Sequence, residues 1–380
     1  MIIGFDAKRA FQNNTGLGNY SRMLICGMAQ QHNDVHSFLY APVMSGEYKG
    51  YFSGFANIST RQPSGFDRRL PNLWRRWGVT THLKGDKIDI FHGLSHELPY
   101  GIPRSIKKVV TMHDLIVWRY PQYYKPFDRW VHRRKQRHAC RIADVVIAIS
   151  EQTKRDLIKY LHVPEQKIRV LYQSCDSLFW NPVSEQDKAD VRETYSLPEK
   201  YIICVGSIEE RKNQLAAVAA LAELPADIHL VILGRPHGGY IHRLNSEIRR
   251  LKLTDRVHII SNAEFEEFPA LYSNAIASVY VSQFEGFGIP ILESMCCDVP
   301  VVTSTLSSMP EAGGWAALYA DPNSPREIAQ HLQRIITSPQ FRAELVERGR
   351  VQREKFSQQN VIANLYDLYQ SLMPAEEGEG

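Results

Sequence analysis

Short runs of apolar and β-branched residues recur along the chain and alternate with segments of helical periodicity. In the first half, strands are expected at residues 2–6, 37–41, 88–92, 108–112 and 145–150. In the second half, they are expected at residues 201–205, 228–233, 257–260, 277–281 and 299–303. Strands that alternate with helices predict parallel sheets joined by crossover helices, which is the α/β class.

Two successive sets of this pattern predict two Rossmann-like domains that face each other across a cleft. The 380 residues suffice for two domains of ordinary size. Periodicity lapses over residues 173–183, so we expect the first domain at 1–175 and the second from 176 onward. Ligands of such sheets bind beyond the carboxyl ends of the strands. The Glu/Gly-rich tail, 376–380, is expected to be disordered.

Composition adds a charge asymmetry to this picture. The chain is 44% hydrophobic and 23% charged, which argues against wholesale disorder and fibrous structure. Its net charge is only +4, but residues 1–175 contain 27 Lys and Arg against 13 Asp and Glu, and the remainder contains 18 against 28. A basic first half suits an anionic partner, which leaves nucleic acid, a membrane surface and a charged substrate open.

The cysteines and the apolar runs bear on the compartment. None of the six cysteines forms a C-x-x-C pair, which predicts reduced, mostly buried thiols in a cytosolic protein. The first residues lack the basic segment of a signal peptide. The longest apolar stretch, 215–234, is interrupted by charged residues and a proline, so we expect any membrane contact to be peripheral.

The first candidate motif, Thr15-Gly-Leu-Gly-Asn-Tyr-Ser21, follows the first expected strand and opens a helix. Gly16 and Gly18 would let the backbone approach a phosphate, which the free N–H groups of a helix N-terminus attract. Ser21 replaces the third glycine of a dinucleotide fingerprint, and the next strand lacks a terminal acid for a ribose. A nicotinamide or flavin site is therefore weakly supported, and a tight turn without ligand contact is equally open.

A second motif is the adjacent pair of cations Arg211 and Lys212, which follows the strand expected at 201–205. At the carboxyl end of a buried strand, the pair is well placed to hold a diphosphate, with Arg bidentate and Lys as a point charge. A solvated surface pair is the alternative, because both residue types are mostly exposed in proteins.

The third motif contains two glutamates, Glu285 in Glu-Gly-Phe-Gly-Ile-Pro and Glu293, with seven residues between them. Pro290 fits the first turn of a helix, so both carboxylates can face one ligand. Carboxylates accept hydrogen bonds from vicinal hydroxyls, and helix N–H groups bind phosphate. This combination describes a nucleotide sugar. The alternative is a capping glutamate followed by an amphipathic helix.

The basic half offers His113 and Asp114 at the end of the strand expected at 108–112. A His beside an Asp at this edge can hold a sugar hydroxyl or move a proton. A lone dipeptide of this kind is more often a structural pair. His92, at the end of the preceding strand, adds to the polar character of the edge.

Together these motifs resemble the family-4 glycosyltransferases of the two-domain GT-B fold, along nearly the whole chain. The similar stretches, in order, are Thr15-Gly-Leu-Gly-Asn-Tyr, His113-Asp-Leu, Ser150-Glu-Gln-Thr-Lys, Gly206-Ser-Ile-Glu-Glu-Arg-Lys-Asn, Leu271-Tyr-Ser-Asn-Ala, Glu285-Gly-Phe-Gly-Ile-Pro with Glu293, and Glu311-Ala-Gly-Gly. Only the glutamate motif is specific alone, whereas the order and spacing make the set specific. The resemblance implies a retaining enzyme without a bound metal or cofactor, and this chain has no Asp-x-Asp motif.

The resemblance also implies roles for individual residues. Arg211 and Lys212 would bind the donor diphosphate and stabilise the leaving group electrostatically. Glu285 would contact the donor sugar hydroxyls, and Glu293 the ribose hydroxyls. The backbone expected to close on phosphate and sugar is that of Gly16, Gly18, Gly286, Phe287 and Gly288. The residues expected on the acceptor side are His92, Asp114 and His113, the last at the junction of sugar and acceptor.

As to function, the resemblance implies transfer of a hexose, with mannose from GDP-mannose favoured, to a lipid-linked or polysaccharide acceptor, as in bacterial surface polysaccharide synthesis. The alternatives are a sugar-nucleotide epimerase of the same fold and a nucleic-acid-binding protein that uses the basic half. No recognised nucleic-acid motif occurs, so nucleic acid is not expected. The family's last helix usually crosses back to the first domain, and 358–375 has the apolar spacing for this, which leaves 176–357 to bind the nucleotide sugar.

Two segments of the basic half, 68–77 and 130–137, interleave tryptophan with arginine. This pattern suits an anionic membrane surface, where rings lie at headgroup level and cations meet anionic lipid. A solvated helix face with the aromatic residues turned inward is equally open. We therefore expect a cytoplasmic protein, with peripheral attachment to the inner face of the plasma membrane as an option.

Overall fold

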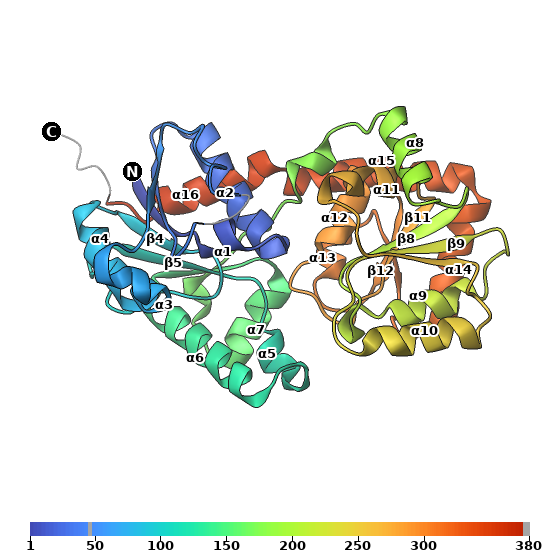
Figure 1. Ribbon diagram of the computed structural model, residues 1–380, viewed down its shortest axis with the longest axis horizontal. Helices are drawn as coiled ribbons and strands as arrows, with labels where there is room; N and C mark the ends of the chain where they lie inside the picture. The colour runs from blue at the N-terminus through green and yellow to red at the C-terminus, as the bar shows by residue number, and fades with distance from the viewer. Residues whose placement is uncertain (45–47, 375–380) are drawn as a thin grey trace. The chain divides into compact units, whose positions relative to one another are not determined.

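The computed structural model describes residues 1–44 and 48–374. The chain divides into two compact units (Figure 1). Unit 1 comprises Met1–Ser174 together with the segment that starts at Gln358, and unit 2 comprises Cys175–Ser357. The expected boundaries, after residues 175 and 357, lie within one residue of these limits. The tail expected to be disordered, 376–380, lies outside the described residues.

Unit 1 is built around a seven-stranded parallel sheet with the order β3-β2-β1-β4-β5-β6-β7. Its strands are β1 Ile2–Asp6, β2 His36–Tyr40, β3 Ile58–Arg61, β4 Ile90–Gly93, β5 Lys107–Met112, β6 Val145–Ala148 and β7 Ile168–Val170. Its helices are α1 Lys8–Gln12, α2 Gly16–Gln31, α3 Pro71–Leu73, α4 Val79–Gly85, α5 Ile116–Arg119, α6 Pro126–Ile142, α7 Glu151–Leu161 and α16 Gln358–Gln370. Because side chains alternate along a strand, Ile90 and Val109 belong to one apolar cluster, whereas Phe91 and Val110 belong to another.

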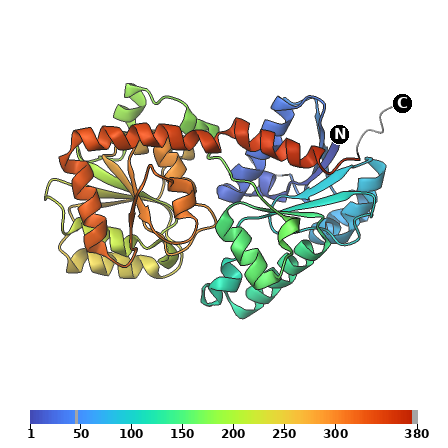
Figure 2. The same cartoon turned by 180° about the vertical axis from the view of Figure 1, so that it is seen from behind.

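The C-terminal helix completes unit 1. Helix α16 packs against α2, as Figure 2 shows from behind. A Cβ atom on Gly27 would lie 2.6 Å from the Ile362 side chain, so this close approach of the two helices needs glycine. Ile362 and Tyr369 are buried in the same apolar cluster as Ile3 and Phe5 of β1. The apolar spacing of the last segment therefore buries it against unit 1.

Unit 2 contains a six-stranded parallel sheet with the order β10-β9-β8-β11-β12-β13. Its strands are β8 Tyr201–Val205, β9 His229–Leu233, β10 Val257–Ile260, β11 Ala277–Tyr280, β12 Val301–Ser304 and β13 Leu318–Ala320. Its helices are α8 Glu185–Thr194, α9 Gln214–Leu221, α10 Tyr240–Arg250, α11 Phe268–Ser273, α12 Ile289–Cys296, α13 Met309–Gly313, α14 Pro325–Thr337 and α15 Pro339–Arg353. Helices α9, α10 and α14 cover one face of the sheet, and α11, α12 and α15 cover the other (Figure 1).

The prediction of two α/β domains with parallel sheets is confirmed. All ten expected strands form, with ends that differ from the expected ones by at most two residues. The sequence pattern misses three strands, β3, β7 and β13, which lie at sheet edges. An edge strand has one neighbour and needs few apolar residues, so Ile58–Arg61 and the three-residue strands β7 and β13 leave little periodic signal.

The cysteines are free, as expected: four of the six are buried, and Cys26 and Cys297 are partly buried. Across residues 1–44 and 48–374, no helix combines the length and the apolar character that crossing a membrane requires.

Candidate active site

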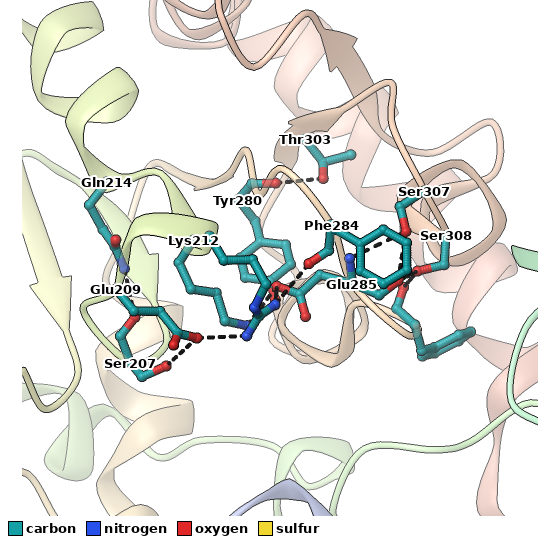
Figure 3. Close-up of polar contacts among 12 residues, drawn as sticks. Ser207, Glu209, Lys212, Gln214, Tyr280, Phe284, Glu285, Thr303, Ser307 and Ser308 are labelled. Atoms are coloured by element: carbon teal, nitrogen blue, oxygen red, sulfur yellow. Dashed lines mark hydrogen bonds and ion pairs between the residues drawn. The ribbon is translucent and has the colours of Figure 1, made fainter. Parts of the chain in front are cut away.

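The loop between β11 and α12 contains the predicted glutamate motif. The hydroxyl of Ser308 lies 2.9 Å from the carbonyl oxygens of both Glu285 and Phe287, which share its one proton, and that of Ser307 donates to the Glu285 carbonyl at 2.6 Å (Figure 3). Gly288 has a φ of +109°, a left-handed conformation that favours glycine, and it immediately precedes α12. Pro290 lies in the first turn of that helix, as predicted. The loop is therefore held rigidly at the carboxyl end of the sheet.

The Glu285 carboxylate forms two ion pairs. Its Oε1 atom lies 2.6 Å from Nη1 of Arg211 and 2.8 Å from Nζ of Lys212, and the residue is only 8% exposed. Burial alone would raise the pKa of Glu285, but Lys212 and Arg211 outweigh burial and hold the pKa at about 2. The three predicted residues thus meet in one cluster, and Glu285 is ionised at neutral pH.

Each of the two cations has a further partner. Arg211 also pairs with Glu209 at 2.6 Å and donates to the Phe284 carbonyl at 2.8 Å. Lys212 donates to the Tyr280 hydroxyl at 2.6 Å, and its ammonium lies 4.9 Å from the centre of that ring. Both belong to the 3₁₀ turn Glu210–Lys212, which follows β8. The predicted alternative, a solvated surface pair, is wrong, because both side chains are largely buried.

The site is close to charge balance, since two carboxylates face two cations. A backbone hydrogen bond of 2.8 Å from Gln283 to the Arg211 carbonyl ties the 3₁₀ turn to the loop that carries Glu285. The amide of Asn213 donates to the carbonyl oxygens of Val281 and Pro322 at 3.2 and 2.7 Å. These contacts fix the cations relative to Glu285. An anionic ligand must therefore share cations that a carboxylate already holds.

Glu293 lies inside α12 and is also only 8% exposed. Its Oε2 atom accepts a hydrogen bond of 3.0 Å from the Tyr272 hydroxyl on α11. Burial raises the pKa of Glu293 to about 7, partly offset by the Tyr272 hydrogen bond and by the charge of Lys212. The charge of Lys212 lowers the pKa of both glutamates.

His113 directly follows β5 in unit 1 and is 5% exposed. Its Nε2 atom is 2.9 Å from the Leu94 carbonyl, and its ring meets Tyr20 edge-on at 4.6 Å. Burial, with a smaller contribution from His96, lowers the pKa of His113 to about 3, so the imidazole is neutral at pH 7. Asp114 is partly buried and accepts a hydrogen bond of 3.0 Å from the Ile116 N–H at the start of α5.

The structure gives His92 a different place from the predicted one on the acceptor side. The residue is completely buried, and its two ring nitrogens lie 2.6 Å from the Tyr369 hydroxyl and 2.8 Å from that of Thr111. An imidazole enclosed on all sides offers no group to an acceptor. Its two hydrogen-bond contacts instead connect β4 with β5 and with α16.

The two glycines of the first motif differ in their surroundings. A Cβ atom on Gly18 would lie 1.7 Å from the Asn13 carbonyl oxygen, so glycine there is needed for the turn itself. The Asn13 side chain accepts from the N–H groups of Thr15 and Gly18, both at 3.0 Å. A Cβ atom on Gly16 would meet nothing within 4 Å, so that position has open space. The tight-turn interpretation therefore holds for Gly18.

A buried ion network in unit 1 was not foreseen from the sequence. Arg75 lies 2.6 Å from Asp6 and 2.7 Å from Glu97, and Lys135 lies 2.8 Å from Glu97. Arg75 belongs to the Arg-Trp segment that was expected to suit a membrane. Within that segment Trp74 is buried and Arg75 is partly buried, whereas Trp77 is 49% exposed.

The second Arg-Trp segment lies on α6, beside a cavity of about 1260 Å³. The basic residues that line this cavity are Arg129, Arg133, Arg134, Arg137, Arg141 and Lys167, together with His138 and His162. Within the part of the chain that the structure describes, none of these arginines forms an ion pair with a carboxylate. Phe127 and Trp130, on the same helix, are 73% and 56% exposed.

Sequence reasoning gave no role to Tyr272, which lies in the stretch Leu271-Tyr-Ser-Asn-Ala, and it missed Tyr280, Ser307 and Ser308. Tyr280 is the last residue of β11, directly before the glutamate loop, and this place at a carboxyl end is a signal that was available. The two serines follow β12, and their contact with the loop depends on the pairing of β11 with β12, which the sequence does not show. Among the described residues, no group of three His, Cys, Asp or Glu side chains is arranged to hold a metal ion.

The sequence is similar to known protein families along most of its length. Residues 185–352 match the family model of glycosyl transferases group 1, and residues 14–177 match that of glycosyltransferase family 4. The chain is 30% identical over 295 residues to O-antigen chain mannosyltransferase B of Escherichia coli, covering 76% of each protein. It is 27% identical over 242 residues to O-antigen chain mannosyltransferase RfbU of Salmonella typhimurium, covering 63% of this chain and 64% of that protein.

A longer relative and two solved structures extend this similarity. The serotype-specific mannosyltransferase WbdA of Escherichia coli is 26% identical over an alignment of 391 residues, gaps included. The alignment covers 98% of this chain but only 48% of WbdA. Among solved structures, Anabaena HepE in complex with UDP and glucose has a TM-score of 0.75 at 18% identity, covering 97% of this chain and 99% of HepE. WaaG, a glycosyltransferase involved in lipopolysaccharide biosynthesis, has a TM-score of 0.70 at 16% identity, covering 97% and 99%.

Proposed function

The chain belongs to the family-4 glycosyltransferases, and from this we propose that it transfers mannose from GDP-mannose to a saccharide or lipid-linked acceptor with retention of anomeric configuration. The enzyme class follows from the family. The observation that carries the proposal is the Glu285 carboxylate held between Arg211 and Lys212 at the head of α12. The mannosyltransferase relatives support the choice of mannose.

We propose that the donor diphosphate takes over the two cations. Arg211 and Lys212 would then face the phosphate oxygens, and the N–H groups at the start of α12 would add their positive potential. Gly288 presents no side chain at this point. The freed Glu285 carboxylate would accept hydrogen bonds from sugar hydroxyls, and Glu293 would do the same for the ribose. The donor would thus replace the ion pairs of Glu285 with Arg211 and Lys212 by ion pairs between its diphosphate and the same two cations.

In the transfer itself, the bond between the anomeric carbon and the diphosphate oxygen breaks, and a bond to the acceptor oxygen forms. The bonding electron pair leaves with the diphosphate, so negative charge grows next to Arg211 and Lys212. Fixed cations stabilise that charge without reorganising, often the largest catalytic contribution. The acceptor proton passes to the departing phosphate. His113, neutral at pH 7, would hold a hydroxyl rather than donate a proton as an acid.

A product assay tests the donor, the reaction and its stereochemistry together. The enzyme is incubated with GDP-mannose, UDP-glucose or UDP-galactose, with and without an oligomannoside acceptor. We expect consumption of GDP-mannose only with acceptor, and an α-linked product by NMR. If the enzyme used only a UDP-sugar as donor, the assignment of GDP-mannose would be refuted. A β-linked product would refute retention of the anomeric configuration. An altered sugar nucleotide formed without acceptor would indicate an epimerase instead.

We further propose that unit 1 attaches to an anionic membrane surface through α6. Like charges crowd this helix: burial, followed by the charges of Arg129 and Arg137, lowers the pKa of Arg133. Cations without carboxylate partners attract anionic headgroups, and exposed aromatic rings suit the interface. Co-sedimentation with phosphatidylglycerol vesicles, but not phosphatidylcholine vesicles, is expected. Binding should weaken with salt.

Matched variants distinguish attachment through α6 from non-specific adsorption to vesicles. Trp130→Ala should weaken vesicle binding, whereas Trp315→Ala should not, although the two rings are similarly exposed at 56% and 51%. Trp315 lies in unit 2, outside the basic helix. Equal effects of the two substitutions, or equal binding to both vesicle types, would refute the proposal.

A further inference from the structure

Tyr272 is a completely buried tyrosine whose hydroxyl reaches the Glu293 carboxylate. Its oxygen lies 3.0 Å from Oε2 of Glu293 and 3.5 Å from the Pro290 carbonyl, the latter too long to count as a strong hydrogen bond. The ring is packed edge-on against Phe179, with centroids 6.0 Å apart. Helices α11 and α12, which bear the two residues, cover the same face of the second sheet (Figure 1). The hydroxyl therefore has one well-defined target.

The direction of this hydrogen bond is fixed by the two ionisation equilibria. Burial raises the pKa of Tyr272 well above its ordinary value, and the nearby Glu293 charge raises it further, so the phenol keeps its proton and donates. Burial raises the pKa of Glu293 to about 7, so both of its forms are populated near neutral pH. A donor aimed at one carboxylate oxygen favours the ionised form and leaves the other oxygen for a second partner.

Other charged and titratable groups face Glu293 as well. Lys212 lowers its pKa and Asp176 raises it. Cys175 and Cys297 have raised pKa values, mainly through burial and partly through the Glu293 charge, so both thiols stay neutral at pH 7. Tyr272 is therefore a hydrogen-bond donor to Glu293, whereas Lys212 and Asp176 act on Glu293 through charge.

We propose that Tyr272 is a positioning residue that orients the Glu293 carboxylate toward the ribose hydroxyls of the donor. This rests on the proposed function, in which Glu293 receives the ribose. Tyr272 would act through Glu293 and would not touch the nucleotide. Without its hydroxyl, the carboxylate would be both less ionised and free to rotate. Affinity for the ribose would then fall, most of all near and below neutral pH.

The test compares the affinities for GDP and for 2′-deoxy-GDP by isothermal titration calorimetry. The measurements run from about pH 6 to about pH 9, a range that includes the raised pKa of the Glu293 carboxyl. The wild type should prefer GDP by about tenfold at high pH, the value of one hydrogen bond to a charged group. This preference should decline as pH falls through about 7, where Glu293 is protonated. UDP and 2′-deoxy-UDP serve as a second ligand pair.

Tyr272→Phe should move the midpoint of this decline upward by about one pH unit, as expected for one lost hydrogen bond to a carboxylate. At high pH the preference should largely return, which a general packing defect would not produce. Tyr201→Phe is the matched control, because it also removes a buried hydroxyl from unit 2, one that donates to the Leu271 carbonyl rather than to Glu293. Its midpoint should equal that of the wild type.

The outcomes separate this inference from the function on which it rests. A wild-type midpoint in Tyr272→Phe, or a loss of preference that is equal at every pH, would overturn the positioning role. Glu293→Gln should abolish the pH dependence of the preference altogether. If Glu293→Gln kept both the preference and its pH dependence, or if the wild type bound ribo- and deoxynucleotides equally, the ribose role of Glu293 would be wrong instead.

Discussion

Glu285→Gln should tighten nucleoside diphosphate binding while it abolishes transfer. The Glu285 carboxylate now occupies Arg211 and Lys212, at 2.6 and 2.8 Å, and these cations help to hold its pKa at about 2 against an ordinary value of 4.5. That difference corresponds to about 3 kcal/mol in favour of the ionised form. A diphosphate that recruits the same cations must give up part of this interaction. Removing the competing charge should therefore raise the affinity for GDP, by about tenfold if roughly half of the interaction is recovered.

Calorimetry with GDP measures the first effect, and acceptor-dependent GDP release from GDP-mannose measures the second. Turnover should fall by about 100-fold or more, since glutamine cannot supply the charge that faces the reacting sugar. Glu209→Gln is the control: it removes a carboxylate that pairs with Arg211 but not with Lys212, so we expect smaller changes in both quantities. Weaker GDP binding in Glu285→Gln, or turnover like that of the wild type, would refute the reasoning that the carboxylate competes with the donor.

Two further predictions concern unit 1. Gly18→Ala should lower the melting temperature by several degrees, because the new Cβ would lie 1.7 Å from the Asn13 carbonyl oxygen. Gly16→Ala should leave the melting temperature unchanged, because a Cβ there would meet nothing within 4 Å. A larger effect at Gly16 than at Gly18 would contradict this prediction. Arg75→Met should destabilise the protein in urea at pH 7 by about 3 kcal/mol, because a buried ion pair loses one partner. Burial alone would raise the pKa of Glu97, but Arg75 and Lys135 lower it to about 2. This stabilisation exists above the unfolded-state pKa and is lost as pH falls toward 2, so the deficit of Arg75→Met should shrink in acid, and a pH-independent deficit would contradict the assignment.

Much of the fold follows from local pattern. Central strands such as β8 and β11 are buried on both faces and leave continuous apolar runs in the sequence. The carboxyl ends of these strands then direct attention to Arg211, Lys212 and Glu285, which the structure brings together. Edge strands such as β13 escape notice because they need little burial.

What escaped prediction depends on contacts between residues far apart in the sequence. His92 and Tyr369 are 277 positions apart, so their hydrogen bond and the burial of the histidine appear only in the folded structure. Tyr272 reaches Glu293 because α11 and α12 cover the same face of the sheet, which no periodicity reveals. Arg75 belongs to a segment whose pattern suits a membrane surface, yet it pairs with Asp6 and Glu97, which lie far from it in the sequence.

The charge asymmetry of the sequence acquires a location in the structure. Several cations of unit 1 are neutralised locally, for example Arg61 by Asp86 and Arg119 by Asp156. Within the described residues, the five arginines of α6 that line its cavity have no carboxylate partner, so part of the excess charge of unit 1 is gathered on one helix. Concentrated charge attracts an anionic surface far more strongly than the same charge spread evenly, because its potential adds up within a screening length of about 8 Å at physiological salt. In unit 2, by contrast, Glu285 and Glu209 balance the two cations of the site. The basic half therefore attracts through unpaired charge, whereas the donor site must exchange one anion for another.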